Sequence, residues 1–190
     1  RQHHGAHPRS GATDVVPLVP ISGVTLEECA EMSRKLAERI YRERGIPCYC
    51  YEAAAYKPER KNLAVCRAGE YEALPEKIKD PERRPDFGPD TYNETVARSG
   101  ASNVGARDFL IAVNFNLNTT STRRANAVAF DVREKGRPKR EGNPLTGKIV
   151  KDADGNPEMI PGTLKGCKAI GWYIDEYGIA QVSMNITDIN

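Results

Sequence analysis

The 190-residue sequence lacks long apolar runs and contains few aromatic residues. No stretch approaches the roughly 18 consecutive apolar residues of a membrane-spanning helix, so we expect no membrane association. Aromatic residues make up 7% of the chain, and 28 basic residues stand against 26 acidic ones. Nucleic-acid surfaces combine a marked basic excess with aromatic side chains, so we expect no nucleic-acid partner. The 39% of hydrophobic residues suffices for a globular core.

The five cysteines are odd in number, and none shows the paired spacing of a zinc site. They are Cys29, Cys48, Cys50, Cys66 and Cys167. Their apolar surroundings favour buried, reduced thiols that pack in the core over redox or nucleophilic roles. We therefore expect a cytoplasmic protein without a structural metal.

The histidines are confined to the first seven residues, at His3, His4 and His7, so any imidazole chemistry must come from there. Three interpretations compete: a remnant of an affinity tag, a metal site, and a general acid or base. A tag would carry a longer run, and a metal would need further ligands. Pro8 restricts the backbone beside His7, and Arg9 supplies a permanent positive charge suited to an anionic substrate. These residues alone leave a catalytic and a structural His7 both open.

Hydrophobic periodicity in the first half predicts alternating strands and helices. Residues 14–21 form a short β-branched run typical of a buried strand. Thr25 and Glu28 make a capping box that opens a helix, and Gly45 ends it. Residues 46–51 are the next predicted strand. A helix between two such strands indicates an α/β fold.

The second half repeats this order, with one strand, one helix and two further strands predicted. They cover residues 109–116, 122–135, 169–175 and 179–187. Between them, Asp152 to Asn156 resembles a calcium loop but lacks its closing glutamate, so its Asp-Gly pair predicts a surface hairpin.

Residues 52–89 have a looser pattern, with a short helix expected around 71–79 and a loop rich in proline before Pro89. The small, glycine-bearing stretch at 99–107 is typical of a linker. We therefore expect one subdomain over 1–98, a linker over 99–107 and a second subdomain over 108–190.

Five long strings, in order along the whole chain, resemble the glutamate formiminotransferase family, which includes the formiminotransferase half of the bifunctional formiminotransferase-cyclodeaminases. The strings are GAHPRSGATDV at 5–15, RAGEYEALP at 67–75, PDFGP at 85–89, VGARDFLIA at 104–112 and GWY at 171–173. Two departures accompany them: extra residues between Pro89 and Gly100, and an insertion over 142–161 that is more consistent with a bacterial member. A family member would begin earlier and continue further, so the resemblance implies the later part of the N-terminal subdomain followed by the first part of the C-terminal one.

The resemblance implies two similar α/β subdomains, each a mixed sheet with packed helices, and a ligand tunnel between them. It implies transfer of the formimino group of N-formiminoglutamate to N5 of tetrahydrofolate, giving 5-formiminotetrahydrofolate and glutamate, in histidine breakdown and one-carbon metabolism. Tetrahydrofolate would be a co-substrate, no metal would be needed, and we expect a homo-oligomer.

The resemblance also assigns site residues. It makes His7 the catalytic acid and base. Folate-binding positions are Gly88, Pro89, Asp90, Thr91, Tyr92 and Gly100. Tyr51, at the end of a predicted strand, is a further folate candidate, with core packing as the alternative. The substrate and folate carboxylates need cations, for which Arg9, Arg67 and Arg107 are candidates.

Two other functions stay open. Formyl transfer from N-formylglutamate would use the same site with a nearly isosteric donor. A noncatalytic folate-binding module would bind folate without releasing glutamate.

Overall fold

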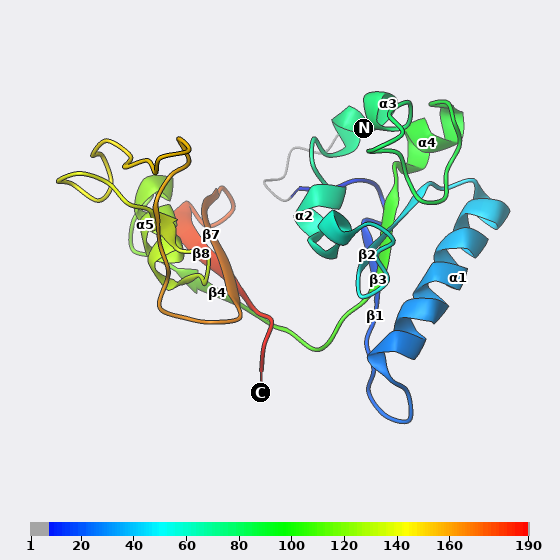
Figure 1. Cartoon of the computed structure of the whole chain (residues 1–190), viewed down its shortest axis with the longest axis horizontal. Helices are drawn as coiled ribbons and strands as arrows, with labels where there is room; N and C mark the ends of the chain where they lie inside the picture. Colours follow the sequence, from blue (N-terminus) through cyan, green and yellow to red (C-terminus); the bar gives the residue numbers. More distant parts are fainter. Residues whose placement is uncertain (1–7, 190) are drawn as a thin grey trace. The chain divides into compact units, whose positions relative to one another are not determined.

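Figure 1 shows the computed structural model, which describes residues 8–189. The chain divides into two compact units between Asp108 and Phe109. His7 and the residues before it lie outside the described part. The first unit contains three strands and several helices: β1 Val15–Leu18, α1 Leu26–Arg44, β2 Cys48–Glu52, η1 Pro58–Lys61, α2 Leu63–Cys66, η2 Tyr71–Ala73, α3 Leu74–Lys77, α4 Glu94–Ser99 and β3 Ser102–Ala106. The second contains β4 Ile111–Asn116, α5 Thr122–Val132, β5 Arg137–Pro138, β6 Met159–Ile160, β7 Cys167–Ile174 and β8 Ile179–Ile186. The expected α/β class is confirmed.

Helix α1 begins and ends where the sequence predicts. The Glu28 amide donates to the Thr25 hydroxyl at 3.2 Å, and the Thr25 amide donates to the Glu28 carboxylate at 2.7 Å. At the other end Gly45 adopts the left-handed conformation and donates to Tyr41 O at 2.7 Å. These contacts satisfy backbone groups that a helix end leaves without partners.

The three strands of the first unit form a parallel sheet in the order β1-β3-β2. Helix α1 covers one face through Cys29, Ala30 and Ala37, and α2, α3 and α4 lie on the other face (Figure 1). Both faces are therefore buried, as parallel sheets require. This accounts for the short apolar run CYCYE of β2, of which four residues are buried.

The expected linker over 99–107 is wrong as secondary structure, because residues 102–106 form β3, the central and fully buried strand of this sheet. Its sequence, SNVGA, looks like a linker because it is small and polar. Within the sheet, Asn103 donates to Ser10 and Asp14, so its amide nitrogen is satisfied. Gly105 leaves room for the ring of Tyr51, which a Cβ would meet at 2.6 Å.

The second unit is an antiparallel sheet in the order β4-β8-β7 with α5 packed on it. Ala125 and Ala129 of α5 contact Ala169, Ala180 and Val182. Among the described strands, the first sheet is thus wholly parallel and the second wholly antiparallel, whereas we expected each to be mixed. The predicted hairpin is confirmed, since Lys151 and Pro157 pair across the turn.

All five cysteines are free and buried, as predicted. Burial raises the pKa of Cys48 and Cys50 to about 12. Between Pro8 and Ile189, no helix is both long and apolar enough to cross a membrane. The same residues contain no group of three His, Cys, Asp or Glu side chains placed to hold a metal ion.

Candidate functional site

The segment from Pro8 to Asp14, which directly follows His7, is fixed by backbone hydrogen bonds to a distant part of the chain. The Ala12 amide donates to Ser99 O at 2.8 Å, and the Ala101 amide donates to Ser10 O at 2.9 Å. These contacts tie it to the amino end of β3. A loop without regular structure is thereby held in one place.

Gly100, a predicted folate-binding residue, is buried where this segment approaches β3. It has φ 70°, and a Cβ at this position would collide with Gly11 Cα. Only glycine fits such a left-handed position against another backbone. The structure therefore gives Gly100 a packing role beside the segment that follows His7.

Asp14 is the polar centre of the segment. Its Oδ1 accepts the Ser10 amide at 2.7 Å, and its Oδ2 pairs with the Arg67 guanidinium. The Asn103 side chain donates to Asp14 O at 2.9 Å. In the described part of the chain, Arg67 Nε and Asn103 Oδ1 are buried without a hydrogen-bond partner. Arg67 thus keeps one unused donor beside this network.

Arg9 is held by two carboxylates. Its Nη1 lies 2.8 Å from Glu70 and its Nη2 2.5 Å from Glu72. The hydrogen bond that Arg9 donates to Glu72 raises the pKa of Arg9 above its usual range, and the charges of both glutamates act in the same direction. These contacts make Arg9 a link between the segment and residues 70–72, with its charge already balanced.

Tyr92 is linked to Arg9 through Tyr71. The Arg9 guanidinium lies 5.9 Å from the centroid of the Tyr71 ring, and the Tyr71 hydroxyl is 3.2 Å from that of Tyr92. Tyr71 donates to Ala97 O at 2.6 Å. Thr91 and Asp90 are exposed, with Asp90 3.7 Å from Arg84.

Gly88 and Pro89 are half-buried at the amino end of β2. Phe87 and Cys48 exchange backbone hydrogen bonds of 2.7 and 3.1 Å. Just before them, Asp86 accepts the Cys50 amide at 2.7 Å and pairs with the buried Arg60 at 2.6 Å. This ion pair positions the start of the predicted folate segment, and no pattern in the sequence indicates it.

Tyr51 and Arg107 lie together at the carboxyl end of the sheet. Tyr51 is 3% exposed and packs in the core of the first unit. Burial raises the pKa of Tyr51. The charge and hydrogen bond of Arg107 and the charge of Arg67 act in the opposite direction. Within residues 8–189, Arg107 pairs with no carboxylate, and its Nη1 donates to Asp108 O at 2.9 Å. Of the three candidate cations Arg9, Arg67 and Arg107, only Arg107 has no carboxylate partner among the described residues.

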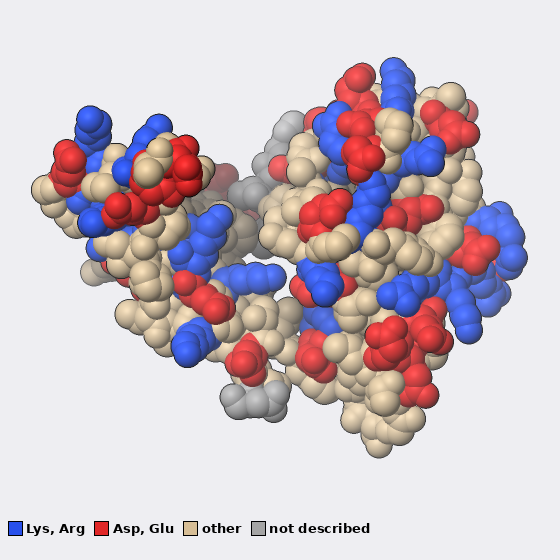
Figure 2. Space-filling model, in the orientation of Figure 1, with Lys and Arg blue, Asp and Glu red and all other residues tan. Residues whose placement is uncertain are grey.

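The structure therefore gathers most predicted residues at the amino end of the sheet: Arg9, Arg67, Gly88, Pro89, Tyr92 and Gly100. Tyr51 and Arg107 lie at the other end, near Leu18, to which the Arg107 amide donates. Asp14, Arg60 and Asp86 complete the arrangement and were missed, because a salt bridge between distant residues leaves no spacing pattern in a sequence. On the face shown in Figure 2, acidic and basic side chains are interspersed.

Comparison with known proteins covers the whole chain. A family profile described as "Formiminotransferase domain, N-terminal subdomain" matches residues 1–107, and one described as "Formiminotransferase domain" matches residues 112–190. The chain is 45% identical over 188 residues to the formimidoyltransferase-cyclodeaminase of Sus scrofa, covering 98% of this chain and 30% of that protein. It is 41% identical over 187 residues to the glutamate formimidoyltransferase of Streptococcus pyogenes serotype M1, covering 98% of this chain and 53% of that protein. The enzyme of the same name from Thermoplasma acidophilum is 37% identical over 188 residues, covering 98% of this chain and 52% of that protein.

The chain therefore spans about a third of the length of the bifunctional relatives and about half of the length of the shorter ones.

Proposed function

Because this chain belongs to the formiminotransferase family, with profile matches over residues 1–107 and 112–190, we propose that it transfers the formimino group of N-formiminoglutamate to N5 of tetrahydrofolate. The observation that carries this proposal is the 41% identity to a glutamate formimidoyltransferase across 98% of the chain. The products are 5-formiminotetrahydrofolate and glutamate.

The reaction needs one group that handles protons near neutral pH. N5 of the folate forms a bond to the amidine carbon and loses a proton, while the bond from that carbon to the glutamate nitrogen breaks and this nitrogen gains a proton. An imidazole can accept the first proton and donate it in the second step. We assign both steps to His7, and general catalysis of this kind contributes about 10²- to 10⁴-fold in rate.

The contacts of the Pro8–Asp14 segment support this assignment. Catalytic groups must be held within fractions of an ångström of the productive geometry. The segment that follows His7 is fixed through Arg9 to Glu70, through Gly11 to Gly100 and through Asp14 to Asn103. We therefore assign Arg9 a positioning role in addition to the proposed contact with a carboxylate.

The substrate and folate carboxylates are assigned to Arg107, Arg67 and Arg9. Arg107 has no carboxylate partner among the described residues, and Arg67 keeps a buried, unused Nε donor. We propose that the folate contacts residues 88–92, Gly100 and Tyr51. We also propose that the reaction takes place in the cytoplasm, in a homo-oligomer and without a metal, and that the two units correspond to parts of the N-terminal and C-terminal subdomains.

Replacing His7 tests the proposal. We expect His7→Ala to lower turnover by about 10²-fold or more, with a modest loss of folate affinity, because the variant removes the proton carrier and leaves the binding contacts. Turnover is measured spectrophotometrically as 5,10-methenyltetrahydrofolate after acid cyclisation.

His4→Ala is the matched control, since it removes an imidazole three residues away, and it should retain normal turnover. Near-normal turnover of His7→Ala would contradict the catalytic assignment. The same assay with N-formylglutamate tests formyl transfer, and folate binding without release of glutamate from either donor would identify a noncatalytic module.

A further inference from the structure

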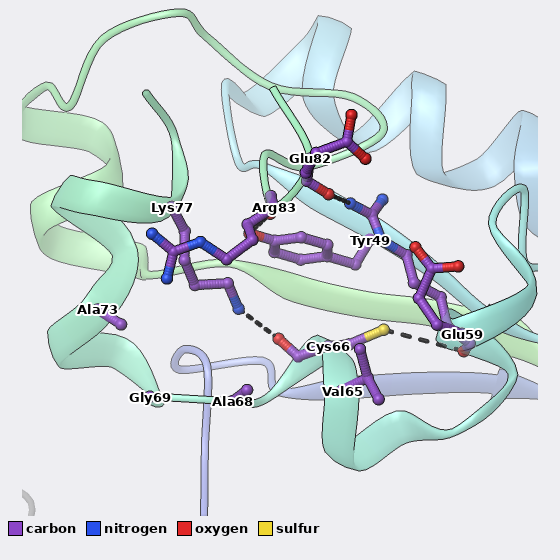
Figure 3. A pocket seen from close by; sticks show the side chains of 11 residues that line it. Tyr49, Glu59, Val65, Cys66, Ala68, Gly69, Ala73, Lys77, Glu82 and Arg83 are labelled. Atoms are coloured by element: carbon purple, nitrogen blue, oxygen red, sulfur yellow. Dashed lines mark hydrogen bonds between the residues drawn. The ribbon is translucent and has the colours of Figure 1, made fainter. Parts of the chain in front are cut away.

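A pocket of about 370 Å³ lies in the first unit between β2, η1, α2 and α3 (Figure 3). None of the predicted site residues lines it. Its walls are mostly apolar, formed by the ring of Tyr49 with Val65, Ala68 and Ala73. This volume is within the range of small-molecule sites in proteins.

Lys77 is a buried cation of this pocket, whose lining also includes Arg60, Arg83 and the exposed residues Glu59 and Glu82. Lys77 is 3% exposed, and its Nζ donates to Cys66 O at 2.5 Å and lies 4.7 Å from the centroid of the Tyr49 ring. Figure 3 shows the ammonium directed at the Cys66 carbonyl, with the Tyr49 ring alongside. An ammonium has three N–H donors, and this bond uses one.

The other cations of the pocket already have partners. Arg60 pairs with Asp86 at 2.6 Å, and Arg83 pairs with Asp80 at 2.6 Å. In the part of the chain that the structure describes, Lys77 has no such carboxylate. A buried charge without a counter-charge is costly, so this pocket is prepared for an anion.

A purely structural role explains only part of this arrangement. Cys66 is the last residue of α2, and its carbonyl is one of the groups that a helix end leaves without a partner. The bond from Lys77 satisfies it. A neutral donor would do so without the cost of burying a charge.

We propose that this pocket binds a small monocarboxylate with an apolar body, whose carboxylate accepts hydrogen bonds from Lys77 Nζ and whose body contacts Val65, Ala68 and Ala73. This site lies beyond the proposed formimino transfer and does not depend on it.

The proposal implies a pH dependence of binding. Burial, followed by the charges of Arg60 and Arg83, lowers the pKa of Lys77 to about 8, while Cys66 acts in the opposite direction. Above this pH the free protein loses the ammonium and binding must take up a proton, so affinity should fall about tenfold per pH unit.

The groups that face Lys77 come from four parts of the unit: Tyr49 from β2, Arg60 and Glu59 from η1, Cys66 from α2, and Glu82 and Arg83 from the loop after α3. Burial raises the pKa of Cys66 to about 11 and that of Tyr49 higher still. The guanidinium groups stay charged throughout. The decline between pH 8 and pH 9.5 is therefore assigned to Lys77.

The experiment titrates benzoate into the 190-residue chain at pH 7 and pH 9.5, followed by the NMR shifts of the Ala68 and Ala73 methyl groups, which do not exchange with water. Benzamide, which has the same shape without the charge, is the ligand control. Lys77→Met removes the charge and keeps the side-chain length, whereas Lys79→Met removes an exposed lysine two residues away. Ala68→Leu narrows the pocket from an exposed position and keeps Lys77.

We expect benzoate to bind and benzamide not to bind, with affinity at least tenfold lower in Lys77→Met and in Ala68→Leu and unchanged in Lys79→Met. Circular dichroism establishes that each variant is folded, and if Lys77→Met is not, Ala68→Leu and the pH series decide. Absence of benzoate binding to the parent chain, equal binding of benzamide, or unchanged affinity at pH 9.5 would overturn the proposal.

Discussion

Arg60 and Asp86 show at the residue scale how the first unit places its predicted folate segment. Both side chains are less than a tenth exposed, and their contact is 2.6 Å long. Arg60 also donates to Glu82 O and Arg84 O, at 3.3 and 2.7 Å. One guanidinium thus satisfies a buried carboxylate and two carbonyls in the loop that leads to Gly88.

We expect Arg60→Met to lower the free energy of unfolding by about 3 kcal/mol, because it leaves the Asp86 carboxylate buried without its cation. Urea denaturation followed by circular dichroism measures the change. Arg39→Met is the control, since its pair with Glu43 is exposed and worth about 0.5 kcal/mol or less. If Arg60→Met lowered the free energy of unfolding by less than about 1 kcal/mol, water or another cation would be stabilising the Asp86 carboxylate in place of Arg60.

At the residue scale, the sequence offers candidate site residues but not the contacts that hold them. Arg9 and Arg67 were identified as cations, but the sequence did not indicate that Glu70, Glu72 and Asp14 would pair with them. Lys77 falls inside the predicted helix around 71–79, where an exposed position is the normal expectation for lysine. Its burial depends on Tyr49 and Cys66, which lie far from it in the sequence.

At the scale of elements, α1 and β3 mark the two extremes of what the sequence predicts. The limits of α1 follow from local signals, a capping box and a terminal glycine, and both are confirmed. The sequence of β3 contains no local strand signal. Its polar Asn103 fits the sheet because the amide nitrogen donates to Ser10 and Asp14, and its Gly105 accommodates a ring from β2. Strands whose partners are distant in sequence lose their signal in this way.

Gly100 allows a test at the same scale. We expect Gly100→Ala to lower the free energy of unfolding by about 2 kcal/mol or more, since it combines a left-handed backbone with a backbone contact too close for a Cβ. Thermal unfolding monitors the loss.

Gly23→Ala is the matched control, because Gly23 has φ 68° and no other part of the chain lies within 4 Å of the place that a Cβ would take, so the variant carries the backbone strain alone, about 1 kcal/mol. Equal losses in the two variants would contradict the packing role of Gly100 against Gly11.

For the whole molecule, the sequence predicts the α/β class but not the strand directions. Strand direction has only a weak signal in the sequence. Strands of a parallel sheet are apolar on both faces, whereas those of an antiparallel sheet alternate, and β7 shows this alternation most clearly. The first sheet depends on β3 entering between β1 and β2, which no local pattern indicates.

The anchoring of the Pro8–Asp14 segment predicts its behaviour in hydrogen exchange. The amides of Ala12 and Ala101 are bonded across about 90 residues of sequence, so they should exchange as slowly as that of Val104 in β3, only when the first unit unfolds. Exchange followed by NMR measures this, with the amide of Gly155 in the exposed hairpin as the fast control. Exchange of Ala12 at the rate of Gly155 would show that the segment opens independently of the sheet.

The buried thiols give the first unit a sensitivity to oxidants that depends on its folding. Thiolates are the species that oxidants attack, and burial holds Cys48, Cys50 and Cys66 in the protonated form at neutral pH. The folded unit therefore resists peroxide. Unfolding exposes these thiols to oxidants, so we expect a reductant to raise the yield of refolded unit after heat or denaturant.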